Sequence, residues 1–212
     1  MSVFPLGFKL TERTLLSAGQ SSSHLKLIYV GNLGALYAIE VLLKAVSLLQ
    51  AEGAPVTLDV AGDGPLRSLV ETYAKQTKGI IFHGYLASTE LDELIRRSHV
   101  GVVPMRQDSG VAVPNKVIDY AMNNLCILNG LKGKTEDLLM EYDAGVFYQV
   151  DDCTSLVCAI RELIGGREVV RQKGMNARRM AETCFNGEMI YQKMACWIEG
   201  IGIAEMSECA NT

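Results

Sequence analysis

Short apolar runs alternate with amphipathic segments between residues 25 and 164, and this order constrains the fold more than any other feature of the chain. The apolar runs have the length of strands, and apolar residues recur at helical spacing in the segments between them. A repeated strand-helix order calls for parallel strands, because each helix returns the chain to the edge of the sheet where the preceding strand began. The sequence therefore predicts one α/β domain built on a doubly wound parallel sheet.

The bounds of the expected elements follow from this alternation. Most of the expected strands are nearly continuously apolar, as strands covered on both faces should be. They are expected at 25–31, 56–62, 79–86, 100–105, 126–131 and 145–150. Helices are expected at 35–51, 65–76, 88–97, 115–123, 134–142 and 153–164, followed by two more at 167–183 and 187–200. The whole is a Rossmann-like sheet of about six strands with extra C-terminal helices.

Composition and charge narrow the class of protein. The chain has 212 residues, 49% of them hydrophobic, which is enough for one sizeable core. A net charge of -4, with no basic run interleaved with aromatics, argues against nucleic-acid binding. The six cysteines have no metal-binding spacing and are expected to be reduced thiols of a cytoplasmic protein. No apolar run approaches the roughly 18 residues of a membrane span, although association with a membrane surface stays open.

The loops after the first two strands are candidate ligand sites. Ligands of open parallel sheets bind at the carboxyl ends of the strands, where loops present helix N-termini and backbone N–H groups to anions. Gly31, Asn32, Leu33 and Gly34 form the first loop, whose two glycines permit close backbone approach, although it lacks the full dinucleotide and P-loop patterns. The second, 61–65, contains Asp63 and ends in a proline suited to the first helical position. A purely structural turn fits this second loop equally well.

The loop at 108–116 carries the most chemistry. Ser109 and Gly110 give it flexibility, Pro114 leads into a helix, and Asn115 is suited to the N-cap. Lys116 adds a positive charge at the helix N-terminus. Together these residues outline a phosphate site. Asp119 lies three positions later, where its carboxylate could accept hydrogen bonds from a ribose diol. A solvated first helical turn with a surface acid explains the same spacing equally well.

Three other conspicuous side chains are better explained by packing. His83 lies in an apolar run with no acid or cysteine clustered near it in the sequence, so a structural role is favoured. Tyr191 and Trp197 lie at helical spacing from Met194, which favours packing over ligand stacking.

Six motifs in order resemble one protein family. They are YVGNLGALY (29–37), AGDGPLR (61–67), IIFHGYL (80–86) followed by STEL (88–91), VPM (103–105), VPNKVIDYAM (113–122) and GVFYQVDD (145–152). Their order and spacing resemble the C-terminal, nucleotide-sugar-binding domain of retaining GT-B glycosyltransferases of the group 1, family-4-like type, over about residues 25–165. This family includes enzymes of capsule, exopolysaccharide and lipopolysaccharide synthesis. Residues 4–8 (FPLGF) resemble its interdomain segment, so we expect a linker remnant at 1–24, the domain at 25–203 and a tail at 204–212.

The resemblance implies roles for individual residues. The loop at 31–34 would face the diphosphate, and Gly84 with Tyr85 would lie near the base. Lys116 is the best candidate for the phosphate contact, and Asp119 stands at the position of the ribose-binding helix glutamate. The family's loop acid is replaced by Val111, so Asp108 would serve only if the loop is re-registered. The basic residues that the family commonly has at Asn32 and near Tyr37 are also absent.

The resemblance implies a donor-binding half of a hexosyltransferase-type, retaining glycosyltransferase. It would transfer a sugar from a UDP- or GDP-sugar to a glycan or lipid-linked acceptor, without metal or other cofactor, and would need an N-terminal acceptor-binding domain for activity. We expect surface polysaccharide synthesis in the cytoplasm or at the inner membrane surface. One alternative is a non-catalytic nucleotide-binding or regulatory module with a degenerate donor site. A second is an epimerase of the same architecture, which the motifs at 61–65 and 113–116 favour less.

Overall fold

The computed structural model describes residues 24–209 of the chain, and side chains up to residue 198. The expected interdomain segment at 4–8, the rest of the linker up to residue 23, and residues 210–212 of the expected tail lie outside the described residues. The expected domain boundaries at 24/25 and 203/204 stay predictions.

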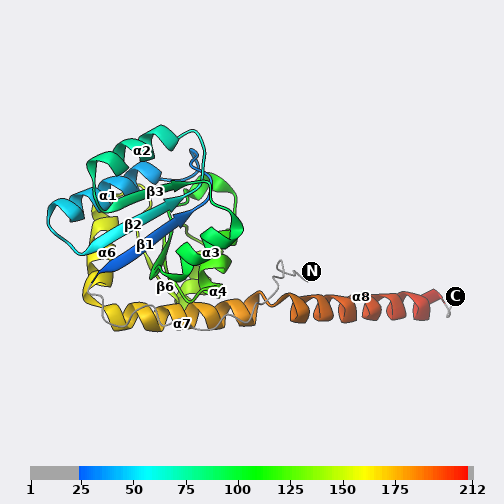
Figure 1. The fold of residues 1–212 in the computed structure, drawn as a ribbon. Coiled ribbons are helices and arrows are strands. Elements are labelled where there is room, and N and C mark those ends of the chain that lie inside the picture. The colour runs from blue at the N-terminus through cyan, green and yellow to red at the C-terminus, as the bar shows by residue number, and fades with distance from the viewer. Residues whose placement is uncertain (1–23, 210–212) are drawn as a thin grey trace.

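The core of the molecule is a six-stranded, all-parallel sheet, as the strand-helix alternation predicts (Figure 1). Its strands are β1 (Leu25–Val30), β2 (Val56–Ala61), β3 (Ile80–Gly84), β4 (Val100–Val103), β5 (Cys126–Asn129) and β6 (Gly145–Phe147). They are arranged in the order β3-β2-β1-β4-β5-β6, and every neighbouring pair is parallel. The strand order reverses between β1 and β4, and such a reversal is where doubly wound sheets open a ligand crevice.

Helices cover both faces of the sheet and bury two separate cores. Strand side chains alternate between faces, so Leu27 and Tyr29 enter one core while Ile28 enters the other. On the first face lie α1 (Ile39–Ala51), α2 (Arg67–Gln76) and α6 (Cys153–Gly165). On the second lie α3 (Ser88–Arg96), α4 (Asn115–Met122), α5 (Lys134–Glu141) and α7 (Arg167–Cys184). This double coverage explains why the strands are apolar on both sides.

Two helices begin later than the sequence pattern predicts. Residues 35–38 form a turn in which Tyr37 N–H donates to Gly34, and Tyr37 then pairs with Met105, so α1 starts only at Ile39. Pro65 is not the first helical residue, because the turn after β2 continues to Leu66 and α2 starts at Arg67. Hydrogen bonds to other loops hold both turns, and they outweigh the local helical pattern.

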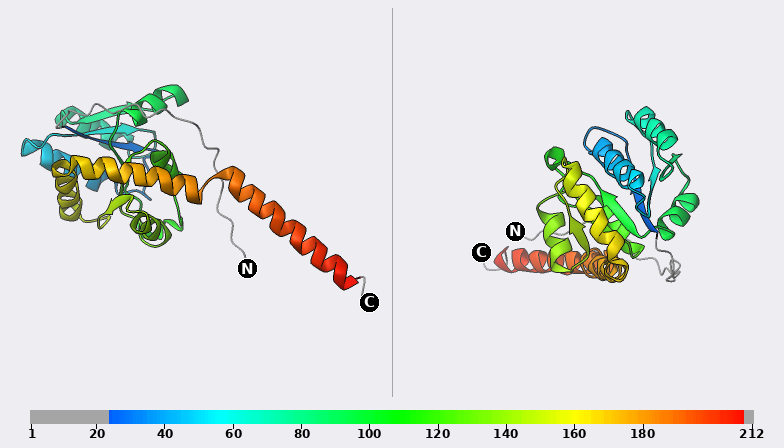
Figure 2. Two further views of the ribbon diagram at one scale, coloured as in Figure 1. Left: turned by 90° about the horizontal axis from the view of Figure 1, so that it is seen from below. Right: turned by 90° about the vertical axis from the view of Figure 1, so that its left-hand side faces the viewer.

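The last helix leaves the globular domain. α8 (Gly187–Cys209) follows α7 and projects away from the sheet (Figure 1 and Figure 2, left). It continues beyond its expected end at 200. Tyr191 is 54% exposed and Trp197 is 46% exposed, so the expectation that they are packed is wrong. Among the described residues, no helix is both long enough and apolar enough to cross a membrane.

Candidate functional site

Backbone hydrogen bonds join the loops at the carboxyl ends of the first three strands. Gly31 N–H donates to Ala61 at 3.0 Å, and Gly62 N–H donates to Gly84 at 2.8 Å. Leu33 N–H donates to Asp63 at 2.9 Å. A side chain at Gly62 would place its Cβ 1.9 Å from the Gly31 oxygen, so this approach requires glycine. The two predicted glycine loops therefore lie side by side, as expected for loops at one edge of a parallel sheet.

Lys116 reaches this edge from the first turn of α4. Its Nζ is buried and has no hydrogen-bond partner among the described residues. It lies 4.3 Å from the centre of the Tyr29 ring and 3.9 Å from that of Tyr37. A Cβ on Gly31 would lie 3.1 Å from the same nitrogen, so Lys116 and the first glycine loop are adjacent. The structure thus brings together two parts of the predicted phosphate site.

Burial changes the acid-base chemistry of this lysine. Loss of hydration disfavours the ammonium form and lowers the pKa of Lys116 to about 7. The two ring faces favour the ammonium form and oppose this decrease. A buried donor without a partner is costly to the fold, which is a reason to suspect a ligand-binding role.

Tyr120 fixes the helix that carries Lys116. Its ring is fully buried against Gly101 of β4, where a Cβ would lie 2.2 Å from the ring. Its hydroxyl oxygen accepts a hydrogen bond from Val30 N–H, the last residue of β1, at 2.9 Å. The neighbouring positions of β1 and β4 in the sheet therefore set the approach of α4 to the first loop.

The start of α4 differs in detail from the prediction. Pro114, not Asn115, holds the N-cap position, with an extended backbone and no side-chain cap. Asn115 is the first helical residue and is exposed, since the proline fixes the backbone one position before it. Thr135, the second residue of α5, donates its hydroxyl to the Ala112 oxygen at 2.7 Å and ties the preceding loop down.

Other predicted residues of the first two loops have intramolecular partners. Asn32 is exposed, and its carbonyl accepts the Tyr29 hydroxyl at 2.6 Å. Leu33 is fully buried, and its side chain packs in the first core. The Asp63 carboxylate accepts Gly64 N–H at 2.8 Å and pairs with Arg67 at 3.1 Å. Asp63 therefore has partners within its own turn, and its predicted contact with a ligand stays a prediction.

The residues predicted near the base and ribose are accessible. Gly84 ends β3 with a φ of +67°, and Tyr85 beside it is 83% exposed. Asp119 is exposed on α4, and its carbonyl accepts the Asn123 side chain at 2.7 Å. Their predicted contacts with a nucleotide stay predictions.

The loop after β4 contains the predicted acid and one cation that sequence reasoning missed. Asp108 is exposed in a single 3-10 turn (Gln107–Ser109), which Gly110 ends with a φ of +68°. Ser109 accepts Val111 N–H at 3.4 Å. Arg106 donates to the Ala35 carbonyl and pairs with Asp151 at 3.1 Å, so it links three loops at this edge.

Two tyrosines complete the surroundings of Lys116, and neither was among the predicted site residues. Tyr29 and Tyr37 meet edge to face with ring centres 5.8 Å apart. Tyr37 comes from the turn where the family commonly has a lysine, and Tyr29 comes from the end of β1. The sequence contained one signal that could have identified this site: the aromatic residue Tyr37 stands where the family commonly has a lysine.

His83 has an acidic neighbour that the local sequence pattern did not reveal. His83 Nε2 on β3 lies 2.6 Å from Asp59 Oδ1 on the neighbouring strand β2, and both side chains are largely buried. The pair lies 24 residues apart in sequence, so the local pattern could not reveal it. It satisfies a buried carboxylate, which agrees with the expected structural role.

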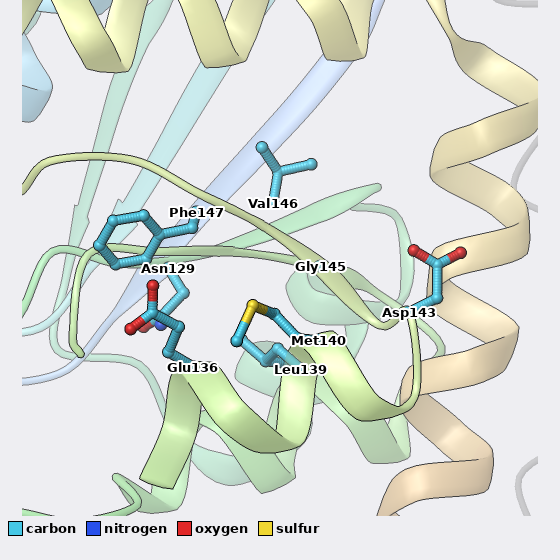
Figure 3. Close-up of a pocket in the computed structure, with 8 residues that line it drawn as sticks. All are labelled: Asn129, Glu136, Leu139, Met140, Asp143, Gly145, Val146 and Phe147. Atoms are coloured by element: carbon cyan, nitrogen blue, oxygen red, sulfur yellow. The ribbon is translucent and has the colours of Figure 1, made fainter. Parts of the chain in front are cut away.

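A cavity of about 220 Å³ lies away from these loops, between α5 and β6 (Figure 3). Figure 3 shows Phe147 and Glu136 on one side of it and Met140 between them and Asp143. Its lining residues are Asn129, Glu136, Leu139, Met140, Asp143, Gly145, Val146 and Phe147. None of the predicted site residues contributes to it.

Comparison with known proteins gives one family and a set of similar folds. A family model described as "Glycosyl transferases group 1" matches residues 24–165. None of the curated protein sequences matches the chain. TarM from S. aureus, solved with UDP among its ligands, has a TM-score of 0.75 at 12% identity, over 92% of this chain and 38% of TarM.

Two further structures are similar. Anabaena HepE in complex with UDP-glucose has a TM-score of 0.69 at 13% identity, over 84% of this chain and 49% of HepE. The C-terminal domain of LpcC, a group 1 glycosyl transferase from Francisella tularensis, has a TM-score of 0.65 at 13% identity, over 76% of this chain and 86% of that domain. At these identities the likeness shows a shared fold. The chain spans less than half of TarM and of HepE.

Proposed function

The chain belongs to the glycosyl transferases group 1 family, and we propose that it is the donor-binding half of an enzyme that uses a nucleoside-diphosphate sugar. The sugar would pass to a glycan or lipid-linked acceptor in surface polysaccharide synthesis. The family membership supports glycosyl transfer, and the UDP and UDP-glucose complexes of TarM and HepE support the class of donor.

One observation carries the assignment of the site: the buried Lys116 Nζ without a hydrogen-bond partner among the described residues, beside the first glycine loop. A diphosphate oxygen would supply the missing hydrogen-bond acceptor and the opposite charge. Charge-assisted hydrogen bonds are strongest where water is excluded. The N-terminus of α4 adds a favourable dipole at the same place.

The proposed chemistry is retaining transfer without a protein nucleophile. The bond between the anomeric carbon and the diphosphate oxygen breaks, the acceptor hydroxyl attacks from the same face, and the leaving diphosphate takes the hydroxyl proton. Lys116 and backbone N–H groups of the 31–34 loop stabilise the charge that develops on the diphosphate. Asp119 holds the ribose, and Asp108 faces the donor sugar. No metal or other cofactor takes part.

A second domain would supply the acceptor site. The shares of TarM and HepE that the chain spans, 38% and 49%, support this division of the enzyme. Without that domain, the site could neither position an acceptor nor exclude water, so this chain alone would be inactive. The proposed place of work is the cytoplasm, with peripheral association at the inner membrane surface where a lipid-linked acceptor is used.

A non-catalytic nucleotide-binding or regulatory module is the second candidate function. It is favoured by the lack of cations at Asn32 and Tyr37 and by the pairing of Asp63 with Arg67 within its own turn. These features leave Lys116 as the main cation beside the glycine loop.

Calorimetric titration with UDP and GDP tests the proposed site. We expect the wild-type chain to bind one of them and the Lys116→Met variant to lose binding, because methionine keeps the side-chain length and removes the cation. Lys75→Met is the matched control, since Lys75 is an exposed lysine in the last turn of α2. Equal binding by the two variants would exclude Lys116 from the site. Failure of the wild-type chain to bind either nucleotide would refute the donor-site proposal.

A further inference from the structure

Lys116 is surrounded by aromatic faces and not by a counter-ion. Tyr29 from β1 and Tyr37 from the β1–α1 turn stand within 4.3 Å of its Nζ, measured to their ring centres. Among the described residues, no carboxylate lies within ion-pair distance of Lys116. The titratable groups around it are Tyr29, Tyr37, and Tyr120 with the exposed Asp119 on α4 itself. Desolvation is the only cause found for the lowered pKa of Lys116.

This arrangement differs physically from an ordinary lysine-carboxylate pair. A carboxylate would keep the ammonium charged and would compete with an incoming phosphate for its N–H groups. A ring face attracts the ammonium through its quadrupole, but it is not a full hydrogen-bond acceptor for the N–H groups. The nitrogen is therefore held in place while its donors stay available to an anion.

We propose that Tyr29 and Tyr37 are positioning residues that hold the Lys116 nitrogen beside the first glycine loop, that burial without a counter-ion keeps this nitrogen a neutral amine before a ligand binds, and that the amine takes up a proton when a nucleoside diphosphate binds. The inference rests on the proposed donor site and adds how the charge of Lys116 changes when the nucleotide binds. The balance is simple: the neutral amine accepts one proton from solvent and becomes the ammonium that contacts the diphosphate. No bond between heavy atoms changes.

The direction of the proton transfer follows from the surroundings of the Lys116 nitrogen without and with a bound diphosphate. In the empty site the ammonium has lost its water and gained only two ring faces, so the neutral form is populated near neutral pH. A bound diphosphate supplies negative charge and acceptors, which favours the ammonium form. Binding and protonation are then linked, and affinity should fall as pH rises above about 7.

Proton uptake can be measured by calorimetry with UDP-glucose and GDP-mannose in buffers of different ionisation enthalpy. Nucleotide sugars are suitable because they lack the terminal phosphate group that itself titrates near pH 6. At pH 8 we expect the wild-type chain to take up between about half a proton and one proton per nucleotide sugar, falling toward zero at pH 6. Lys116→Arg is the matched control, because arginine stays protonated throughout this range. If both the wild type and Lys116→Arg bound the nucleotide sugar with the same heat in every buffer, the proton linkage would be overturned. The proposed donor site would still stand.

The positioning role has its own test at Tyr37. Tyr37→Leu should weaken nucleotide-sugar binding roughly three- to thirtyfold, while Tyr37→Phe, which keeps the ring face, should bind nearly as wild type. Equal loss in both variants would point to the hydroxyl or to packing and would overturn the aromatic role.

Lysine titration by NMR separates failure of this inference from failure of the proposed function. With ¹³Cε-labelled lysine, we expect one resonance of the unliganded chain to titrate near pH 7, and to be absent in Lys116→Arg. A Lys116 resonance that titrates near pH 10 refutes the inference whether or not any nucleotide binds. Titration near pH 7 with no binding of either nucleotide sugar, UDP or GDP would refute the donor site and, with it, the linkage to nucleotide.

Discussion

Replacing Lys116 with methionine should stabilise the folded domain at neutral pH while it abolishes the proposed binding. The pKa of Lys116 falls from 10.5 to about 7 on burial. Between these two pH values the unfolded chain binds more protons than the folded one, so the free energy of unfolding of the wild type should rise with pH across this window. Below about pH 7 the lysine is charged in both states, and the penalty for burying its charge is fully present.

The magnitude can be worked from the same decrease. At about 1.4 kcal/mol per unit, a decrease from 10.5 to about 7 corresponds to about 5 kcal/mol. The gain for Lys116→Met at pH 6 should then be on the order of 5 kcal/mol, and it should disappear above about pH 10.5.

Urea unfolding followed by circular dichroism at pH 6, 8 and 10 measures this effect. The quantity to compare is the difference in free energy of unfolding between wild type and variant, because the other titrating groups are the same in both proteins and their contributions cancel. Lys75→Met should change stability little at any pH, since that lysine is exposed. If Lys116→Met were destabilising at pH 6, or if its effect did not depend on pH, then Lys116 would be solvated or paired and the reasoning would be wrong. A gain in stability with loss of binding is the behaviour expected of a residue kept for function.

The remaining predictions concern the nucleotide and the reaction. Asp119→Ala should weaken nucleotide binding by about 1 to 3 kcal/mol, the range for a hydrogen bond to a charged group, with folding retained; unfolding of the variant with unchanged residual affinity would make the residue structural. EDTA should leave UDP or GDP affinity unchanged in calorimetry, and a large loss on chelation would contradict a metal-independent site. The chain alone should transfer no radiolabelled sugar from a panel of UDP- and GDP-sugars to membrane lipid acceptors, because half a cleft lacks proximity effects worth roughly 7 to 11 kcal/mol. Sustained turnover in that assay would refute the half-enzyme proposal.

Much of the fold could be read from the sequence because its signals are local. Each strand is an apolar run and each helix has its own periodicity, so all six strands and their parallel pairing were predicted. The predicted resemblance to a GT-B glycosyltransferase domain is confirmed by the family model and the similar folds. The retaining course of the reaction stays a prediction.

The helix starts were predicted less well for an equally physical reason. Residues 35–38 have a helical pattern, yet Ala38 N–H donates to Pro104 and Tyr37 pairs with Met105, both from the loop after β4. Such contacts depend on which strands are neighbours. Local propensity is weak compared with a buried hydrogen bond to another loop, so a boundary set by tertiary contacts cannot be found by pattern alone.

The sequence by itself determined the type of fold, and it predicted the edge of the sheet where a ligand would bind and Lys116 as the candidate cation. Only the tertiary structure decided what surrounds that cation. Tyr29, Tyr37 and Lys116 come from β1, the turn after it and α4, and they meet because β1 lies beside β4 in the sheet and Tyr120 anchors α4 to both strands. The state of the lysine follows from these contacts, since loss of water lowers the pKa of its amine and the two ring faces oppose that decrease.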